Sequence, residues 1–354
     1  MYNVYFGIIK RNALGWRFKL MEDKTKMDLT SSEMSILWKT YIFETLNRCI
    51  LKHFIATVED NEIATIIKDK LNTKEQRIRT LTEIFKKENF PVPIGFTDHD
   101  INVSAPRLFT DAFMAHYIYY MATMAIDNYR IGVTVSPRAD IRQFFISGIN
   151  TFIQFTDRIM DCLLQKGLFA RSPYVPYPKQ IDFVQETSFI HDIFGKKRPL
   201  QTIQISHVCL NLQRNAIGQQ LLIAFKQTAK SEEVKAYMDE GIKLSSSLME
   251  TFNTLLKEDD LIPPSYSGLG VTDSTEAPFS EKLMLSLITS LNAYAISLYG
   301  LSLSESARDD LFAWYTKILA QTGEYGMDGA KLMIKNGYLE EPPKAPNRES
   351  LAKA

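Results

Sequence analysis

Two histidines have the residue type and spacing best suited to chemistry. His53 and His116 each fall on the apolar side of a predicted helix in the first half of the chain. A neutral imidazole can bind a metal ion or transfer a proton. With Glu44 or Asp127 beside them, the two rings could form one metal or small-molecule site. The alternative, which we favour, is two core histidines bonded to backbone or tyrosine hydroxyls, so no catalytic residue, metal or cofactor is assigned.

An Arg-x-Asp pattern occurs twice, as Arg138-x-Asp140 and Arg308-x-Asp310. An arginine and an aspartate at this spacing could bind an anion or take part in acid–base chemistry. In the first turn of a helix, however, aspartate complements the helix dipole, and the arginine can pair with another helix. We therefore favour a structural role.

Three tyrosines, Tyr117, Tyr119 and Tyr120, cluster on one predicted helix and could line a cavity. Met121 and Met124 lie beside them, and this combination favours core packing.

The elements that must position these residues are duplicated. Phe54 and Phe225 are 171 residues apart, as are Pro93 and Pro264, whereas Gly167 and Gly337 are 170 apart. His53 then corresponds to Ala224, and an offset of 171 matches His116 with Leu287. The offset between equivalent residues changes by only one residue along the unit, and such an internal repeat indicates a tandem duplication.

Each unit contains four helical patterns. In the first unit they begin near Ser31 or Ser32, near Glu62, after Ser104-Ala-Pro106 and at Ser136-Pro137, and the last ends at Gly167. In the second unit the third helix is predicted to open at Ala277-Pro278 and the fourth at Ser304 or Ser306, with Gly337 as its end. Two tight helix pairs joined by a longer crossover predict an all-α tandem duplication of an antiparallel, ferritin-like four-helix bundle.

The predicted organisation has five parts. They are a loosely ordered N-terminal extension (1–28), the first bundle (29–167), a Pro-rich connector (168–199), the second bundle (200–343) and a C-terminal tail (344–354). The connector contains a predicted short helix over Ile181–Phe194, which we expect to pack between the bundles because its apolar residues should leave water.

Composition excludes several classes of protein. Lys plus Arg equals Asp plus Glu, at 41 each, so a primary nucleic-acid binder is not expected. No run of about 18 apolar residues appears, so we predict no membrane span. Cys49, Cys162 and Cys209 fit free core thiols in a reducing compartment, which favours the cytoplasm. Phosphate-binding loops, dinucleotide fingerprints and nucleophile elbows do not occur.

A di-iron centre, the usual chemistry of such bundles, requires Glu-x-x-His on two of the helices. None of the five histidines has an acid three residues before it. Those positions hold Ile50, Phe96, Phe113, Ser188 and Gln204.

Several segments resemble a domain-of-unknown-function family of spore-forming Firmicutes with tandem ferritin-like bundles. They are Ala105–Asp111, Lys197–Leu200, Ala277–Met284, Asp328–Ile334 and Gly337–Pro343. Some members of that family carry a provisional spore-coat label, and the family supplies no catalytic residues to transfer. The resemblance implies a non-catalytic structural or interaction protein of the cytoplasm, deposited in the spore coat or linked to stress, with protein partners or self-association. The alternative is a small-molecule or metal-binding bundle that uses the first repeat.

Overall fold

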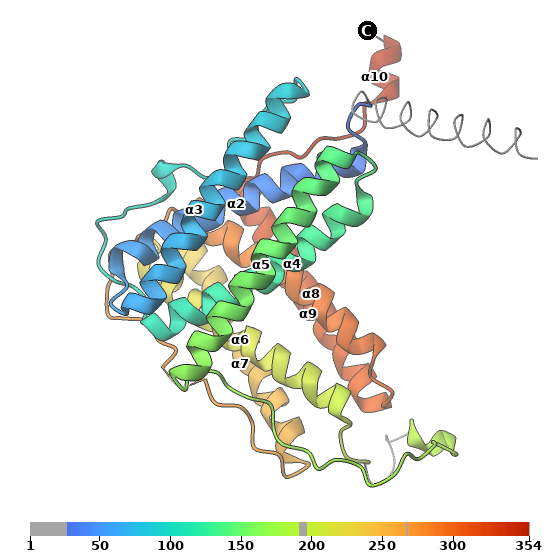
Figure 1. The fold of residues 1–354 in the computed structure, drawn as a ribbon. Helices are drawn as coiled ribbons and strands as arrows, with labels where there is room; N and C mark the ends of the chain where they lie inside the picture. The colour runs from blue at the N-terminus through green and yellow to red at the C-terminus, as the bar shows by residue number, and fades with distance from the viewer. Residues whose placement is uncertain (1–26, 191–196, 267, 354) are drawn as a thin grey trace, which may run out of the picture.

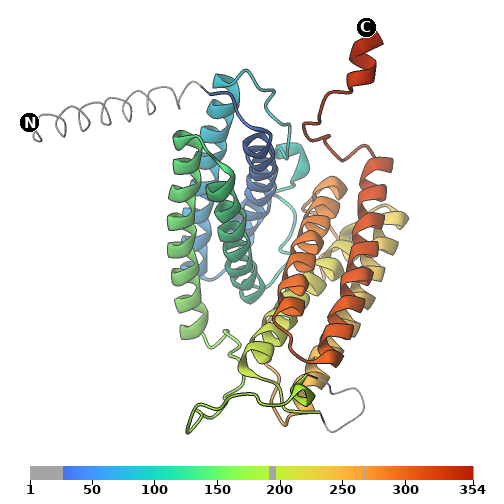
Figure 2. The ribbon, with the colours of Figure 1, turned by 90° about the vertical axis from the view of Figure 1, so that its right-hand side faces the viewer.

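The protein is two four-helix bundles that lie side by side (Figures 1 and 2). The computed structural model describes residues 27–190, 197–266 and 268–353. The first repeat contains α2 (Ser31–Thr57), α3 (Asn61–Lys87), α4 (Asp111–Val135) and α5 (Ala139–Gln165). The second contains α6 (Thr202–Thr228), α7 (Glu232–Lys257), α8 (Glu281–Ser304) and α9 (Asp309–Lys335), and the short α10 (Arg348–Lys353) follows. The predicted all-α tandem duplication is confirmed. The predicted extension 1–28 lies almost wholly outside the described residues.

The helices divide into inner and outer ones. α2, α4 and α6 bury residues on most of their faces, whereas α3, α5 and α7 each bury one stripe. This matches the rule that a helix apolar all round lies inside, while a one-sided helix lies at the surface. One buried cluster runs through both repeats, from Leu37 in α2 to Phe225 in α6 and Leu285 in α8. The two bundles therefore share a core.

The two crossover loops pair with each other. Ile101 bridges to Phe279 and Phe109 bridges to Val271, both in antiparallel fashion. Ile101 corresponds to Val271 in the repeat, and Phe109 corresponds to Phe279. The same two equivalent positions of each loop therefore form the contact. This is the exchange expected across a two-fold axis, here within one chain.

Helix caps locate the one-residue slip between the repeats. The caps Asp60 and Ser231 are 171 residues apart, whereas Thr110 and Ser280 are 170 apart. The slip therefore falls in the crossover, and the residue equivalent to His116 is Ser286. The sequence-based match of His116 with Leu287 was wrong by one position.

Several predicted helix starts were early. α5 begins after Arg138 and α9 after Arg308, because the Ser136 hydroxyl donates to Gly132 of the preceding helix instead of capping the next one. The third helices begin after Thr110 and Ser280, whose hydroxyls accept the helical N–H groups of Phe113 and Leu283.

The predicted ends at Gly167 and Gly337 were right. Both follow the C-cap residue with positive φ, +66° and +67°, where glycine carries no steric penalty.

The prediction for the connector was wrong where it is described. Over 181–190 it forms only a 3₁₀ turn, Thr187–Phe189, and Ile181 and Phe183 are exposed rather than packed between the bundles. The inner helices already fill the contact between the bundles, which leaves no room there for a further helix. Residues 191–194 of the predicted helix lie outside the described residues.

Candidate functional site

A cluster of charged side chains lies inside the first bundle. Glu44 from α2 is fully buried, and its Oε2 forms an ion pair with Lys74 Nζ of α3 at 2.7 Å. Its Oε1 accepts a hydrogen bond from the Tyr129 hydroxyl at 2.6 Å. Arg77 Nε donates to the same Tyr129 oxygen at 2.7 Å, and the buried Lys70 Nζ donates to the Ile118 carbonyl at 2.8 Å. We call these five side chains, Glu44, Lys70, Lys74, Arg77 and Tyr129, the ion cluster.

The ion cluster holds more positive than negative groups, and the electrostatics reflect this. Burial lowers the pKa of Lys70 well below its usual range, with the neighbouring Lys74 as the second cause. Burial also lowers the pKa of Lys74, although Glu44 opposes that shift. The pKa of Tyr129 is raised by burial and by the Glu44 carboxylate, so Tyr129 is a hydrogen-bond donor at neutral pH. Glu44 is thus the one group that balances the buried cations.

Packing closes this centre. Lys74 Nζ lies 4.6 Å from the Phe152 ring centroid and 5.5 Å from that of Phe43. A Cβ at Gly148 would lie 2.6 Å from the Arg77 guanidinium and 2.2 Å from the Tyr129 ring. Only glycine therefore fits there, and the middle of the first bundle is filled by side chains that satisfy one another.

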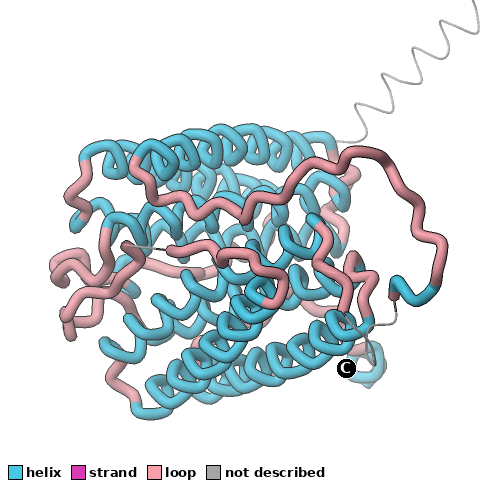
Figure 3. Tube along the Cα trace, turned by 90° about the horizontal axis from the view of Figure 1, so that it is seen from below, coloured by secondary structure: helices cyan, strands magenta, loops and turns pink. Residues whose placement is uncertain are grey.

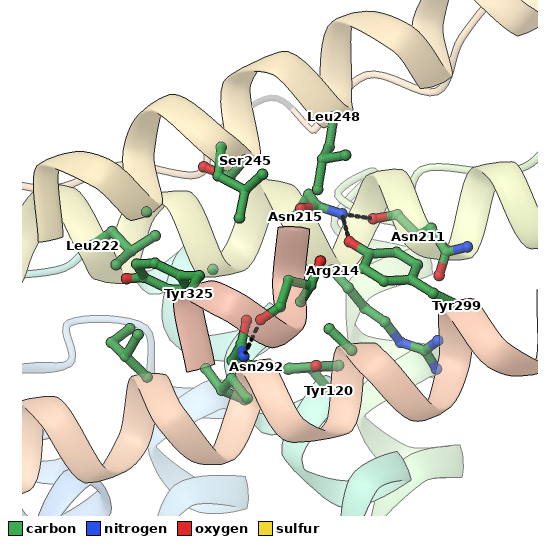
Figure 4. A pocket seen from close by; sticks show the side chains of 17 residues that line it. Tyr120, Asn211, Arg214, Asn215, Leu222, Ser245, Leu248, Asn292, Tyr299 and Tyr325 are labelled. Carbon is green, nitrogen blue, oxygen red and sulfur yellow. Dashed lines mark hydrogen bonds between the residues drawn. The ribbon is translucent and has the colours of Figure 1, made fainter. Parts of the chain in front are cut away.

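The second bundle is hollow at the same place. The positions of Glu44, Lys70, Lys74 and Arg77 are taken there by Asn215, Gly241, Ser245 and Leu248. Phe43 and Phe152 are replaced by Arg214 and Thr322, and Tyr129 is retained as Tyr299. All seven of these residues line one cavity of about 80 Å³ (Figure 4). We call it the second-repeat cavity.

Amides and hydroxyls organise the polar side of the cavity. Asn215 Nδ2 donates to the Tyr299 hydroxyl and to the Asn211 carbonyl, both at 2.8 Å. Asn292 Nδ2 donates to the Thr322 carbonyl at 2.9 Å (Figure 4). Thr322 Oγ1 is buried and has no hydrogen-bond partner among the described residues. An unsatisfied buried hydroxyl is costly, so it offers a contact to any molecule that enters.

In one wall of the cavity, Gly241 allows Tyr325 to pack directly against the backbone of α7. Tyr325 stacks on Tyr237 with ring centroids 4.4 Å apart, and a Cβ at Gly241 would lie 2.3 Å from the Tyr325 hydroxyl. Lys70, the side chain at this place in the first repeat, is absent here. Tyr325 and Leu222 occupy the start of the space that it would take.

Arg214 and Tyr120 complete the lining where the bundles meet. The Arg214 guanidinium lies 5.8 Å from the Tyr120 ring centroid and 5.4 Å from that of Tyr294. No ion pair of Arg214 with a carboxylate occurs within the described part of the chain. The nearby Asp127 carboxylate accepts a hydrogen bond from the Tyr294 hydroxyl at 2.5 Å. Of the three clustered tyrosines, Tyr117 is core, as we favoured, whereas Tyr120 lines a cavity of the other repeat.

The two candidate histidines are both buried but face different neighbours. The His53 ring packs edge-on against Phe279 of the second repeat, and neither of its nitrogens has a partner among the described residues. His116 Nε2 bonds the Leu168 carbonyl at 3.1 Å. Burial lowers both pKa values, that of His53 to about 4. Glu44 is bound to Lys74 and Tyr129, and Asp127 is bound to Tyr294. The structure therefore does not bring the two histidines and these two acids together in one site.

Within the described residues, no group of three or more His, Cys, Asp or Glu side chains has the geometry to hold a metal ion. Cys49, Cys162 and Cys209 are free and buried, and burial raises the pKa of Cys49 and of Cys162 to about 11. Thiols with such pKa values are poor nucleophiles at neutral pH.

The repeated arginines are structural, as we favoured. Arg138 binds both oxygens of Asp140, at 3.1 and 2.8 Å, and also pairs with Glu88 at 2.8 Å. Arg308 binds both oxygens of Asp310, at 2.8 and 2.9 Å. Each pair fixes the start of the last helix of its repeat.

One described helix, α8, is long and apolar enough by length and composition to cross a membrane. Its apolar residues Leu283, Leu285 and Leu287 are fully buried in the bundle core, which accounts for its composition.

The sequence pattern did not indicate that Lys70, Lys74 and Arg77 are buried, because lysines and arginines on a helix usually mark its solvated face. A signal was present in the repeat. The equivalent second-repeat positions hold Gly241, Ser245 and Leu248, none of which carries the charge that a solvated helix face would retain.

Comparisons with known proteins identify the family. The chain has no match among curated proteins. A solved structure described as "a putative spore coat protein" from Bacillus halodurans is 19% identical, with a TM-score of 0.37, covering 45% of this chain and 99% of that one. The family model "Protein of unknown function (DUF3231)" matches twice, over residues 18–181 and 188–351. The chain therefore belongs to the DUF3231 family and carries two tandem copies of its domain.

Proposed function

We propose that this protein is a non-catalytic structural or interaction protein whose connector binds a protein partner or a second copy of the chain. The observation that carries the proposal is the exposure of large apolar residues in the connector. Tyr177 is 90% exposed and Phe183 85% exposed, and Tyr174, Ile181 and Val184 are also mostly exposed. Contiguous exposed apolar surface on a folded protein marks an interaction site.

The form of the connector supports this role. Its described part before residue 191 runs as a long loop over the helices and includes the short turn Thr187–Phe189 (Figure 3). The connector contains three prolines, Pro173, Pro176 and Pro178, each of which restricts the backbone and lacks an N–H donor. A restricted backbone loses less conformational entropy when it binds a partner. Val175 packs on the second-repeat core, so the loop is anchored near its start.

A matched pair of variants tests the proposal. In the triple variant Tyr177→Ser, Ile181→Ser and Phe183→Ser, helicity and the unfolding midpoint should stay the same, because these side chains bury little surface. Self-association in sedimentation, or retention on the protein's assembly in cells, should be lost. Ile262→Ser, at an equally exposed position in the second crossover, is the control and should retain both. If the triple variant associates like the wild type, the connector is not the binding segment.

We place this role in the spore coat or in stress physiology, which is the setting implied by the family resemblance. In a spore-forming host, extraction of purified spores should release the protein with the coat fraction. Recovery only from the cytosol of vegetative cells would refute the coat setting. The proposal that the connector binds a partner would then still be tested by the triple variant.

A metal or small-molecule site built on His53 and His116 is the less well supported alternative. The unpartnered ring nitrogens of His53 favour it. The separate engagements of Glu44 and Asp127 count against it. Elemental analysis of freshly purified protein, with His53→Ala as the control, distinguishes the two proposals.

A further inference from the structure

We propose that the second-repeat cavity binds a short-chain organic carboxylate, with its acid group at Arg214 and its carbon chain between the leucines of the wall. This inference goes beyond the interaction role and does not depend on the connector. It starts from the comparison of two copies of one domain within the same chain.

The comparison of the two repeats shows that the cavity is not a packing defect common to both copies of the fold. The equivalents of Glu44, Lys74, Arg77 and Phe152 in the second repeat are smaller and neutral, and Lys70 is replaced by glycine. The retained Tyr299 hydroxyl accepts from Asn215 where Tyr129 donates to Glu44. The fold therefore tolerates a filled centre, and the second copy has an open one built on the same framework.

Charge indicates an anionic ligand. The cavity lining contains no Asp, Glu, His, Cys or Lys, and Arg214 is its single charged residue. Arg214 rests on Tyr120 and Tyr294 and forms no ion pair within the described part of the chain. A guanidinium presents a planar fork of donors that matches a carboxylate, and a partly buried one without a direct ion pair favours binding an anion.

The rest of the lining indicates a ligand with a carbon chain. The aliphatic part of the wall consists of large side chains, Leu222, Leu244, Leu248, Ile288 and Leu291. Inorganic phosphate would lose its hydration against these side chains without gaining donors, whereas an alkyl chain gains contact. The unpartnered Thr322 hydroxyl and the Asn292 side chain offer one further polar contact on the wall.

Size limits the chain length. The cavity of about 80 Å³ is smaller than the engineered cavity of about 150 Å³ that holds benzene. A ligand of roughly four to six non-hydrogen atoms is therefore expected, the size of acetate to butyrate.

The test uses the full chain, with butyrate and the neutral butyramide as probes in titration calorimetry or ligand-observed NMR. Wild-type protein should bind butyrate about tenfold or more tightly than butyramide, since a charge-assisted contact is worth at least one decade in affinity. From acetate to butyrate the affinity should rise about fourfold per methylene, because each buries apolar surface.

Two variants localise the binding. Arg214→Gln should remove the preference for butyrate and leave butyramide binding unchanged. Thr322→Phe introduces the side chain of Phe152, its first-repeat equivalent, and should abolish binding of both probes. Should Thr322→Phe fail to fold, Ser245→Leu fills the opposite side of the cavity and serves the same purpose.

Four results would overturn the proposal, and three of them concern the probes and the variants. They are no binding of butyrate to the wild type, a butyrate preference that survives in Arg214→Gln, and undiminished binding in the filled variant. An affinity that does not depend on chain length would also refute it, because that result indicates simple charge pairing at the surface.

Discussion

Replacing Glu44 with glutamine removes one negative charge from the middle of the first bundle and keeps the shape of the side chain. The glutamine oxygen can still accept from the Tyr129 hydroxyl, so the substitution isolates the charge. At 2.7 Å and an effective dielectric constant of about 20, the attraction between Glu44 and Lys74 is about 6 kcal/mol. Part of it is offset by the desolvation of both groups. Removal of one partner of a buried pair typically costs about 3–5 kcal/mol, and we expect a loss of this size.

The pH dependence gives a second check on the same variant. The pKa of Lys74 is already lowered by burial in the wild type, and Glu44 opposes that shift. Without Glu44 the folded-state pKa should fall further, so the unfolded chain binds more protons than the folded one below the normal lysine pKa. Stability of the variant should therefore rise with pH up to about 10.4, where the unfolded lysine also loses its proton.

Urea unfolding followed by circular dichroism measures the loss, and hydrogen exchange of α2 and α3 localises it to the first repeat. Asn215→Gln, at the equivalent position of the second repeat, is the control and should cost about 1 kcal/mol, because only neutral hydrogen bonds change. Adding Lys74→Met to Glu44→Gln should cost less than the sum of the two single changes. A loss below about 1 kcal/mol, or additive single changes, would refute the idea that Glu44 balances the buried cations.

Three further substitutions test other parts of the structure. Lys70→Met should raise stability at neutral pH by about 1–3 kcal/mol, since folding must bury or deprotonate an amine that has no ion-pair partner among the described residues. The exposed Lys68→Met should change the urea midpoint little, and a destabilised Lys70→Met would contradict this. His53 has a folded-state pKa of about 4 against about 6.5 unfolded, so stability should fall as pH drops from about 6.5 to about 4, by up to about 3 kcal/mol, and His53→Leu should flatten that slope in acid unfolding curves. Arg138→Lys should lower the thermal midpoint more than Arg308→Lys, because among the described residues only Arg138 has a second acidic partner; equal effects would show that this partner is not stabilising.

The sequence by itself determined the local features of this protein. The duplication, the all-α class and the ends of helices at Gly167 and Gly337 follow from residue types and spacing, since caps, proline breaks and positive-φ glycines act within a few residues. The fourth helix starts were misplaced by two or more residues, because a serine near a helix end can bond backward to the preceding turn, as Ser136 does.

Only the tertiary structure decided what each helix face meets. Lys70, Lys74 and Arg77 have the pattern of a solvated stripe, and they are buried because α2 and α4 supply Glu44 and Tyr129 opposite them. His53 faces Phe279, a residue more than 200 positions away in the other repeat, which no spacing within one helix could reveal. The second-repeat cavity has the same origin. It exists because small residues on several helices converge on one point, and that convergence depends on the packing of the whole chain.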